Sequence, residues 1–383
     1  MNCQKLIETV DALKDEYLKV WVDVCNIESP TRYKVGVDAV GNYFAALSEK
    51  KGWLVERFPQ PVAGDVLCIT MNPDAKKEPI CFSGHMDTVH EIGLFGNPPV
   101  RIEGDKLYGP GAEDCKGGVV AGFLAMDALD RCGFRDRPVR MLLQSDEEGG
   151  SSVSGKATIN YMCQRAQGSV AFFNLEGGES DEACIERKGI VTFLLTVKGV
   201  SAHSSNCAKK GANAIAEMAY KIIELEKLKD DSGLTCNCGV ISGGSVPNTV
   251  PDTCQLKINI RYANAEQLQW VREYVQNVAD TVHIPGCTCT VEQITFRVAM
   301  EYTERNEKLV ERINEILEAN GMEKKRIIKR KGGSDAADMT CAGVPCVDSL
   351  GVDGDFIHNP GEFGYISSLA ESAKKLAVIT YCF

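Results

Sequence analysis

Histidine, tryptophan and long apolar stretches are all scarce in this sequence. Its 383 residues include five histidines and three tryptophans. No run of about 18 apolar residues occurs, which argues against a membrane span. Residues 1–20 form a charged amphipathic stretch without the apolar core of an export signal. We therefore expect a protein that neither crosses a membrane nor is exported.

Cysteine is abundant, but the spacings that would give it a structural role are missing. The seventeen cysteines are an odd number, and close pairs occur only at Cys236/Cys238 and Cys287/Cys289. Neither pair has the CxxC spacing of a structural zinc site or a thioredoxin-like motif. Mostly buried, reduced thiols are therefore expected, which points to the reducing cytoplasm.

Positive charge is also in deficit. The chain has 42 basic and 53 acidic residues, a net charge of −11. Such a field repels phosphate backbones and anionic lipid, so neither a nucleic-acid partner nor a membrane surface is expected. Apolar residues make up 44% and charged residues 25%, close to globular averages, which excludes disorder of the whole chain. The length exceeds one ordinary core and suggests two packed units.

The order of the predicted elements indicates an α/β domain at the start of the chain. Two segments with helical periodicity come first, and apolar runs of strand length follow, separated by helical or loop segments. Uninterrupted apolar runs are typical of strands that are buried on both faces. We expect a largely parallel sheet with helices on both faces. The strand-like runs cover 66–70, 79–84, 139–145 and 170–175.

A second unit interrupts this domain. From about residue 188 the pattern changes to strand, helix, strand, strand, helix, strand, the βαββαβ order of a ferredoxin-like α+β domain. After residue 297 helices and strands alternate as before. The predicted organisation is therefore a catalytic domain in two segments, 1–187 and 298–383, with an inserted domain at 188–297.

Polar side chains follow three of the predicted strands where each strand ends. His85 follows the run at 79–84, Glu147 and Glu148 follow the next, and Glu176 follows the third. Ligands of open α/β sheets bind outside the carboxyl ends of the strands. We therefore expect these side chains to lie close together.

Two further segments add to this set. Asp114 lies in a glycine-rich turn at 109–118, and His358 precedes the last predicted helix. Asp87 follows His85 at a spacing that lets an acid orient a metal-bound imidazole. Carboxylates this close repel one another unless cations neutralise them, and one cation would leave excess negative charge. Two histidines and three carboxylates suit a zinc pair bridged by one carboxylate.

Each of these features also has an ordinary structural explanation. A lone histidine at a strand end is usually structural, and an acidic pair is usually a solvated edge. The order and spacing of the whole set argue against that explanation here. His90 and His283 have no partner pattern and are expected to be structural. The loop at 104–118 lacks the glycine spacing of a nucleotide-binding turn, which excludes a nucleotide site there.

Six short motifs resemble those of the M20 metallopeptidases, and the resemblance covers nearly the whole chain. That family includes glutamate carboxypeptidases, tripeptide aminopeptidases, acetylornithine and succinyl-diaminopimelate deacylases, and aminoacylases. The motifs are GHMDTV, GPGAEDCKGG, SDEEGG, NLEGG, GVSAHSS and HNPGEF. One departure is Cys115, which stands where many relatives have Met or another bulky residue.

The resemblance implies a role for each residue of the cluster. Two Zn²⁺ ions per chain are expected, with Co²⁺ or Mn²⁺ as substitutes. His85 and Glu176 would hold one ion, Glu148 and His358 would hold the other, and Asp114 would bridge both. Asp87 would orient His85, Glu147 would be the general base, and the peptide bond between Asp114 and Cys115 would be cis.

The resemblance extends to the inserted domain. His203 is similar to a family histidine that reaches across a dimer to the scissile carbonyl. Asn248 and Arg261 resemble positions that grip the substrate's carboxylate, although for Arg261 a charged strand end is an equal alternative. A homodimer through residues 188–297 is therefore expected.

The expected reaction is hydrolysis of the amide bond of a short peptide. An N-acyl amino acid deacylase shares every catalytic residue and remains an alternative, since pocket shape decides between the substrates. A regulatory protein that binds metal without catalysis is the third alternative. Glu147 argues against it, because a pure metal binder has no use for a general base.

Overall fold

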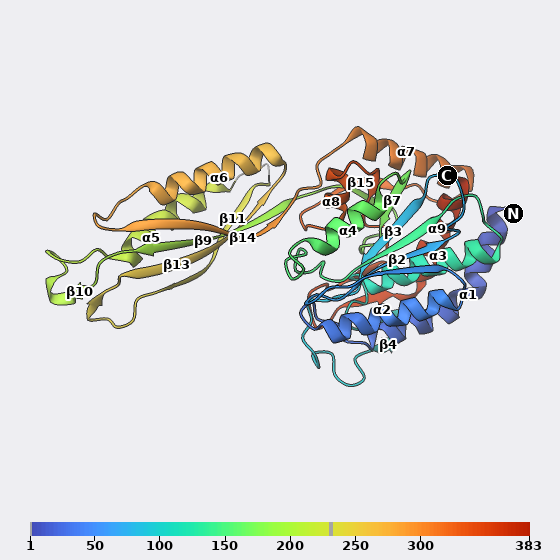
Figure 1. Ribbon diagram of the computed structural model, residues 1–383, viewed down its shortest axis with the longest axis horizontal. Coiled ribbons are helices and arrows are strands. Elements are labelled where there is room, and N and C mark those ends of the chain that lie inside the picture. Colours follow the sequence, from blue (N-terminus) through green and yellow to red (C-terminus); the bar gives the residue numbers. More distant parts are fainter. Residues whose placement is uncertain (1, 230–232) are drawn as a thin grey trace. The chain divides into compact units, whose positions relative to one another are not determined.

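The chain folds into two compact units in a computed structural model that describes residues 2–229 and 233–383 (Figure 1). The first unit comprises Met1–Glu186, Tyr302–Lys329 and Ser334–Phe383, and the second comprises Arg187–Glu301 and Arg330–Gly333. The short return segment joins the second unit because Arg261 donates a hydrogen bond to the carbonyl of Lys331 at 2.8 Å. The sequence pattern placed that segment in the catalytic domain.

A six-stranded sheet is the centre of the first unit. Its strand order is β1-β2-β6-β3-β7-β16. The pairings β6–β3, β3–β7 and β7–β16 are parallel, whereas β1–β2 and β2–β6 are antiparallel. The strands span Leu54–Phe58 (β1), Val66–Met71 (β2), Val139–Gln144 (β6), Ile80–His85 (β3), Ala171–Asn174 (β7) and Cys346–Val347 (β16).

The sheet is therefore mixed, and the expectation of a largely parallel sheet needs correction at its β1–β2 side. The connection from β2 to β3, residues 72–79, contains no helix. A parallel crossover needs a dozen or more residues and usually a helix. Because this connection is too short, β2 runs opposite to β3.

Helices cover both faces of this sheet. Met141 of β6 lies under α3, where a side-chain atom at Gly122 would meet it. The neighbouring Arg140 points to the other face, where it donates to the carbonyl of Arg165 in α4 at 2.6 Å. The helices span Cys3–Cys25 (α1), Lys34–Glu49 (α2), Lys116–Arg131 (α3), Ala157–Ala166 (α4), Glu304–Ala319 (α7), Ala336–Cys341 (α8) and Ile366–Cys382 (α9).

The core of the first unit also fixes loops around the strand ends. Trp21 of α1 is fully buried, and its indole N–H donates to the carbonyl of Ala112 at 3.1 Å. Phe44 of α2 stacks on Phe123 of α3 with ring centroids 4.7 Å apart. Within the described part of the chain, no helix combines the length and apolar character needed to cross a bilayer.

A small four-stranded sheet in the first unit was not predicted. Its order is β17-β18-β5-β4. Its pairing of Phe363 with Tyr108 brings the segment after His358 beside the glycine-rich turn that carries Asp114. The strands span Gly354–Asp355 (β17), Phe363–Tyr365 (β18), Lys106–Tyr108 (β5) and Arg101–Glu103 (β4), and a separate two-stranded sheet pairs Glu182–Arg187 (β8) with Arg326–Arg330 (β15).

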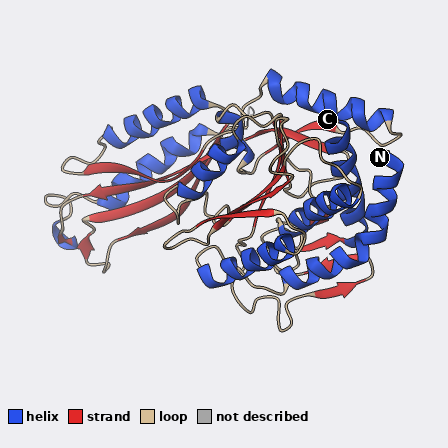
Figure 2. Ribbon diagram, turned by 45° about the vertical axis from the view of Figure 1, so that its right-hand side comes forward, coloured by secondary structure: helices blue, strands red, loops and turns tan. Residues whose placement is uncertain are grey.

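The second unit has four antiparallel strands in the order β11-β13-β9-β14, with α5 and α6 packed against the sheet (Figure 2). Strands β9 and β13 alternate between buried and less buried residues, as expected of a sheet with one covered face. The elements span Gly189–Lys198 (β9), Ala202–His203 (β10), Ser204–Asn206 (η1), Ala214–Leu225 (α5), Glu226–Leu228 (η2), Thr235–Gly243 (β11), Thr249–Val250 (β12), Thr253–Tyr262 (β13), Ala265–Asp280 (α6) and Thr288–Arg297 (β14).

The cysteines all lie in the described ranges, and none of them forms a disulfide. Nine of the seventeen are buried, and only Cys207 and Cys341 are exposed. Burial raises the pKa of Cys25 and of Cys115 to about 12, which keeps these thiols protonated and unreactive.

Candidate metal centre

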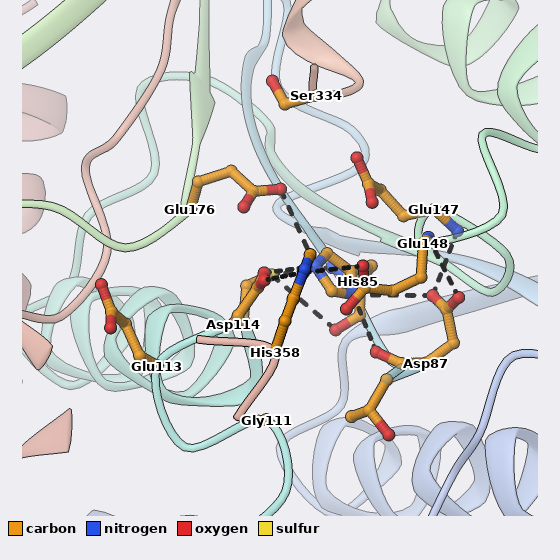
Figure 3. Close-up of polar contacts among 12 residues, drawn as sticks. His85, Asp87, Gly111, Glu113, Asp114, Glu147, Glu148, Glu176, Ser334 and His358 are labelled. Atoms are coloured by element: carbon orange, nitrogen blue, oxygen red, sulfur yellow. Dashed lines mark hydrogen bonds and ion pairs between the residues drawn. The ribbon is translucent and has the colours of Figure 1, made fainter. Parts of the chain in front are cut away.

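His85 ends β3 in the middle of the mixed sheet, and its buried imidazole connects two carboxylate groups (Figure 3). Its Nε2 lies 3.0 Å from Asp114 Oδ1 and 3.8 Å from Glu176 Oε1. Its Nδ1 lies 2.8 Å from the backbone carbonyl oxygen of Asp87 and 3.5 Å from the Asp87 carboxylate. Asp87 therefore holds Nδ1 mainly through its backbone carbonyl, and this contact directs Nε2 at the carboxylates of Asp114 and Glu176.

The fully buried carboxylate of Asp87 holds the turn that carries the two adjacent glutamates. It accepts hydrogen bonds from the backbone N–H groups of Glu147 at 3.1 Å and Glu148 at 3.2 Å. The hydroxyl of Thr31 donates to it at 2.8 Å. Asp87 therefore fixes the segment after β6 relative to the end of β3.

Asp114 lies between two histidines. One of its oxygens faces His85, and the other, Oδ2, lies 3.2 Å from His358 Nε2. His358 Nε2 is also 3.3 Å from Glu148 Oε2. The bond between Asp114 and Cys115 is cis, as the resemblance implied. A carboxylate whose two oxygens face two different imidazoles has the geometry of a bridging ligand.

Shifted pKa values show how much negative charge is concentrated here. Burial opposes ionisation of Asp114, but hydrogen bonds from His358 and His85 outweigh it and hold its pKa well below the usual range. Burial and the charge of Asp114 raise the pKa of Glu148 to about 8, and the same two causes raise the pKa of Glu176 well above its ordinary value. Contacts with Asp114 and Glu148 raise the pKa of His358 to about 10. Cations stabilise such a cluster in place of protons.

Two overlapping groups of side chains in the described part of the chain could hold metal ions, and neither includes His358. One consists of His85, Asp114 and Glu148, and the other of His85, Cys115 and Glu176, each with ligand atoms within 4.8 Å of one another. The sequence pattern treated Cys115 only as a packing residue. Its sulfur accepts a hydrogen bond from the backbone N–H of His85 at 3.0 Å. Imidazole and carboxylate donors in this arrangement fit zinc.

The expected substrate residues lie in the second unit and do not form one group. His203 and Asn248 are neighbours, because β10 pairs with β12 and the N–H of Ser204 donates to the carbonyl of Asn248 at 2.9 Å. The exposed ring of His203 contacts the hydroxyl of Ser205 at 2.8 Å. Strand β13 begins at Thr253, shortly after β12, which pairs with the strand of His203. Arg261 lies eight residues beyond Thr253, near the other end of β13, which is roughly 26 Å away along the strand.

Two histidines without an expected partner have one in the structure. His90 is buried, and its Nε2 lies 2.6 Å from Glu362 Oε2. His283 stacks on Tyr220 with ring centroids 4.7 Å apart, and its Nδ1 lies 3.8 Å from Glu217. Sequence reasoning missed Glu362 altogether. The only local signal for it is its position four residues after His358, in the motif HNPGEF.

A cluster of histidines and carboxylates at the strand ends of a mixed α/β sheet suits a metal-dependent hydrolase. The chain belongs to the peptidase family M20/M25/M40, whose sequence pattern it matches over residues 81–380, and the resemblance of its motifs is thereby confirmed.

The chain is also similar to individual proteins, in sequence or in fold. The chain is 28% identical to carboxypeptidase G2 of Pseudomonas sp. (strain RS-16) over 358 residues, 92% of this chain and 84% of that protein. It is 27% identical to a succinyl-diaminopimelate desuccinylase of Sulfurimonas denitrificans over 73% of this chain and 77% of that one. The crystal structure of a Staphylococcus aureus tripeptidase has the same fold, with a TM-score of 0.79 at 21% identity over 96% of this chain and 98% of that chain.

Proposed function

We propose that the chain binds two zinc ions and hydrolyses the amide bond of short peptides. The observation that carries the proposal is Asp114, whose two oxygens face His85 and His358 separately. One ion would lie with His85 and Glu176, the other with Glu148 and His358, and Asp114 would bridge them. Five ligands exceed what one tetrahedral zinc uses. Co²⁺ and Mn²⁺ accept the same donors and would substitute.

Glu147 and Asp87 would supply the proton transfer and its positioning. Bound zinc polarises the scissile carbonyl and acidifies water. Glu147 is not one of the five proposed ligands, and its carboxylate is buried, so it can take a proton from the attacking water and pass it to the leaving nitrogen. The backbone N–H of Glu147 donates a hydrogen bond to the Asp87 carboxylate at 3.1 Å, which fixes Glu147, the proposed base, beside the proposed ligands.

Relatives support two substrate classes. Similarity to a carboxypeptidase, and a fold shared with a tripeptidase, favour a peptide. Similarity to a desuccinylase keeps an N-acyl amino acid as the alternative. A metal-binding protein without catalysis is the weakest candidate, because it leaves Glu147 without a role.

We also propose a homodimer formed by the inserted unit, residues 188–297. Strands β11 and β14 are the edges of its sheet, and edge strands can pair with another chain. Large apolar side chains on α5 and α6 are exposed, which favours a symmetric interface. They are Ile215, Tyr220, Ile223 and Trp270. In this dimer His203 and Asn248 would contact the substrate of the partner's site, with Arg261 as a candidate for its carboxylate.

The test is a hydrolysis screen of the zinc-loaded protein against dipeptides, tripeptides and N-acyl amino acids. The chelated protein and Glu147→Gln serve as controls. Turnover of peptides above N-acyl amino acids is the expected result. The reverse order would favour the deacylase, and absence of turnover in a protein that holds two zinc ions would contradict the enzyme.

A further inference from the structure

Glu362 is a buried carboxylate that accepts hydrogen bonds from the loop that carries Asp114, the proposed bridging ligand. It is 1% exposed and immediately precedes β18. Its Oε1 accepts hydrogen bonds from the backbone N–H groups of Glu113 at 2.9 Å and Asp114 at 3.0 Å. Its Oε2 lies 3.4 Å from the backbone nitrogen of Gly111 and 2.6 Å from His90 Nε2. Both oxygens therefore have partners, which a buried charge requires.

The same side chain belongs to the segment that carries a second ligand. Glu362 follows His358 by four residues, and its backbone carbonyl accepts from the N–H of Gly109 at 3.3 Å. One residue therefore joins the His358 loop to the Asp114 turn through both its side chain and its main chain. This connection lies between the segments that carry Asp114 and His358.

Its partner His90 fixes the other side of the carboxylate. His90 is 5% exposed, and its ring packs edge-on against Phe95 with centroids 4.8 Å apart. The buried amine of Lys116 on the same turn interacts electrostatically with Glu362, while its hydrogen bond goes to the carbonyl of Ile27 at 2.8 Å. Glu362 is thus held by His90 and by backbone N–H groups.

We propose that Glu362, supported by His90, is a positioning residue that sets the bridging carboxylate of Asp114 relative to His358. This inference rests on the proposed pair of zinc ions. His85 ends β3 and Glu176 follows β7 of the central sheet, and the hydrogen bonds of Glu362 given above involve neither residue. Loss of the connection should therefore weaken the ion held by Glu148 and His358 much more than the ion held by His85 and Glu176.

The test compares Glu362→Gln with a matched control, Asp127→Asn. Asp127 is also a buried carboxylate of the first unit, 3% exposed, and it bonds to Tyr17, Lys51 and Arg131 away from the ligands. The Glu362→Gln substitution would keep one acceptor oxygen, but the new NH₂ group would face the N–H of Gly111. Zinc stoichiometry and the two affinities are measured by chelator competition, and Co²⁺ absorption spectra report ligand geometry without turnover.

In Glu362→Gln we expect the zinc held by Glu148 and His358 to bind 10- to 100-fold less tightly, the range typical of outer-shell partners of metal ligands, with an altered Co²⁺ spectrum. The zinc held by His85 and Glu176 should stay within about threefold of the parent, and Asp127→Asn should change neither affinity while folded. Equal weakening of both ions, or no weakening, would overturn the inference.

His90→Gln is the second variant, in case Glu362→Gln does not fold. It keeps every contact of Glu362 with the backbone, so a smaller but equally selective weakening is expected, and unchanged affinities would overturn the support assigned to His90. Failure of the proposed function is distinguishable, because the unmodified protein would then bind a single zinc.

Discussion

The backbone N–H of Glu147 donates to Asp87 Oδ1 at 3.1 Å, which ties the turn after β6 to the end of β3. Adjacent residues on such a turn point in different directions. Glu148 directs its carboxylate at His358, whereas the side chain of Glu147 points in another direction (Figure 3). This arrangement lets two neighbouring glutamates of one chemical type have different roles.

Glu147→Gln should retain both zinc ions and substrate affinity while kcat falls by about 10²- to 10⁴-fold, the range for loss of a general base. The substitution keeps the size of the side chain and removes the proton acceptor. Zinc content by elemental analysis and steady-state kinetics check it. Near-normal turnover, or loss of a zinc ion, would show that the base lies elsewhere.

Glu148→Ala should lose one zinc ion and activity together. Its carboxylate is the partner of His358 in the proposed second site, at 3.3 Å, and alanine offers no donor. Equilibrium dialysis against buffered zinc should then give one tight ion per chain. Two tightly bound ions in this variant would contradict the assignment of Glu148 as a ligand.

Zinc affinity should rise with pH. In the metal-free protein the pKa of Glu148 is about 8 and that of His358 about 10, so both hold a proton at pH 7. Both must release that proton to bind metal, so filling the site formed by Glu148 and His358 near pH 7 should by itself release about two protons. The affinity of the second site should increase roughly 100-fold per pH unit below pH 8 and about tenfold per unit between pH 8 and 10.

Calorimetry in buffers of different ionisation enthalpy measures the protons released, and chelator-buffered titrations between pH 6 and 9 measure the affinity. Zinc affinity that is independent of pH over this range would contradict the protonation states of Glu148 and His358.

Much of the candidate site could be predicted because the proposed ligands come at or just after apolar runs in the sequence. His85 ends β3, and Glu148 and Glu176 follow β6 and β7, so the edge of the sheet brings them together. The direction of β2 could not be predicted, because pairing partners leave no local pattern. Strands of two or three residues, such as β17 and β5, are too short to show a period. Glu362 and His90 are 272 residues apart, and no local pattern joins them.

A buried ion pair should stabilise the second unit. The amine of Lys221, 1% exposed, donates to the carbonyls of Val278, Ala279 and Thr281 at 2.8–3.0 Å and lies 3.0 Å from Glu217. Lys221→Met would leave these groups and a buried carboxylate without their cation. The free energy of unfolding should fall by about 3–5 kcal/mol.

Chemical denaturation that follows unfolding of the second unit measures this loss. Lys227→Met, at an exposed pair with Glu224, should leave the midpoint unchanged.

Burial raises the pKa of Glu217, but its bonds with Lys221 and with backbone N–H groups outweigh this effect and lower the pKa. The pair therefore stabilises the fold above about pH 4 and loses its effect as the pH falls further. A loss below 1 kcal/mol at pH 7 would contradict the assigned role of Lys221.

His203 should act on the active site of the other subunit in the proposed dimer. Its ring is exposed and contacts the nearby hydroxyl of Ser205, a surface contact that a substrate can replace. His203→Ala and Glu147→Ala should each be nearly inactive alone. After subunit exchange, a mixed dimer combines an intact Glu147 with an intact His203 at one of its two sites. Mixing equal amounts should therefore restore about a quarter of the parent activity, since half of the dimers are mixed and each has one complete site.

Differently tagged subunits verify that the exchange between the His203→Ala and Glu147→Ala chains takes place. Ser205→Ala mixed with Glu147→Ala is the matched control, since Ser205→Ala removes the neighbour of His203 but should retain activity by itself. No recovery despite proven exchange would show that each chain supplies its own complete site, because the mixed dimer then gains nothing from the His203 of its partner.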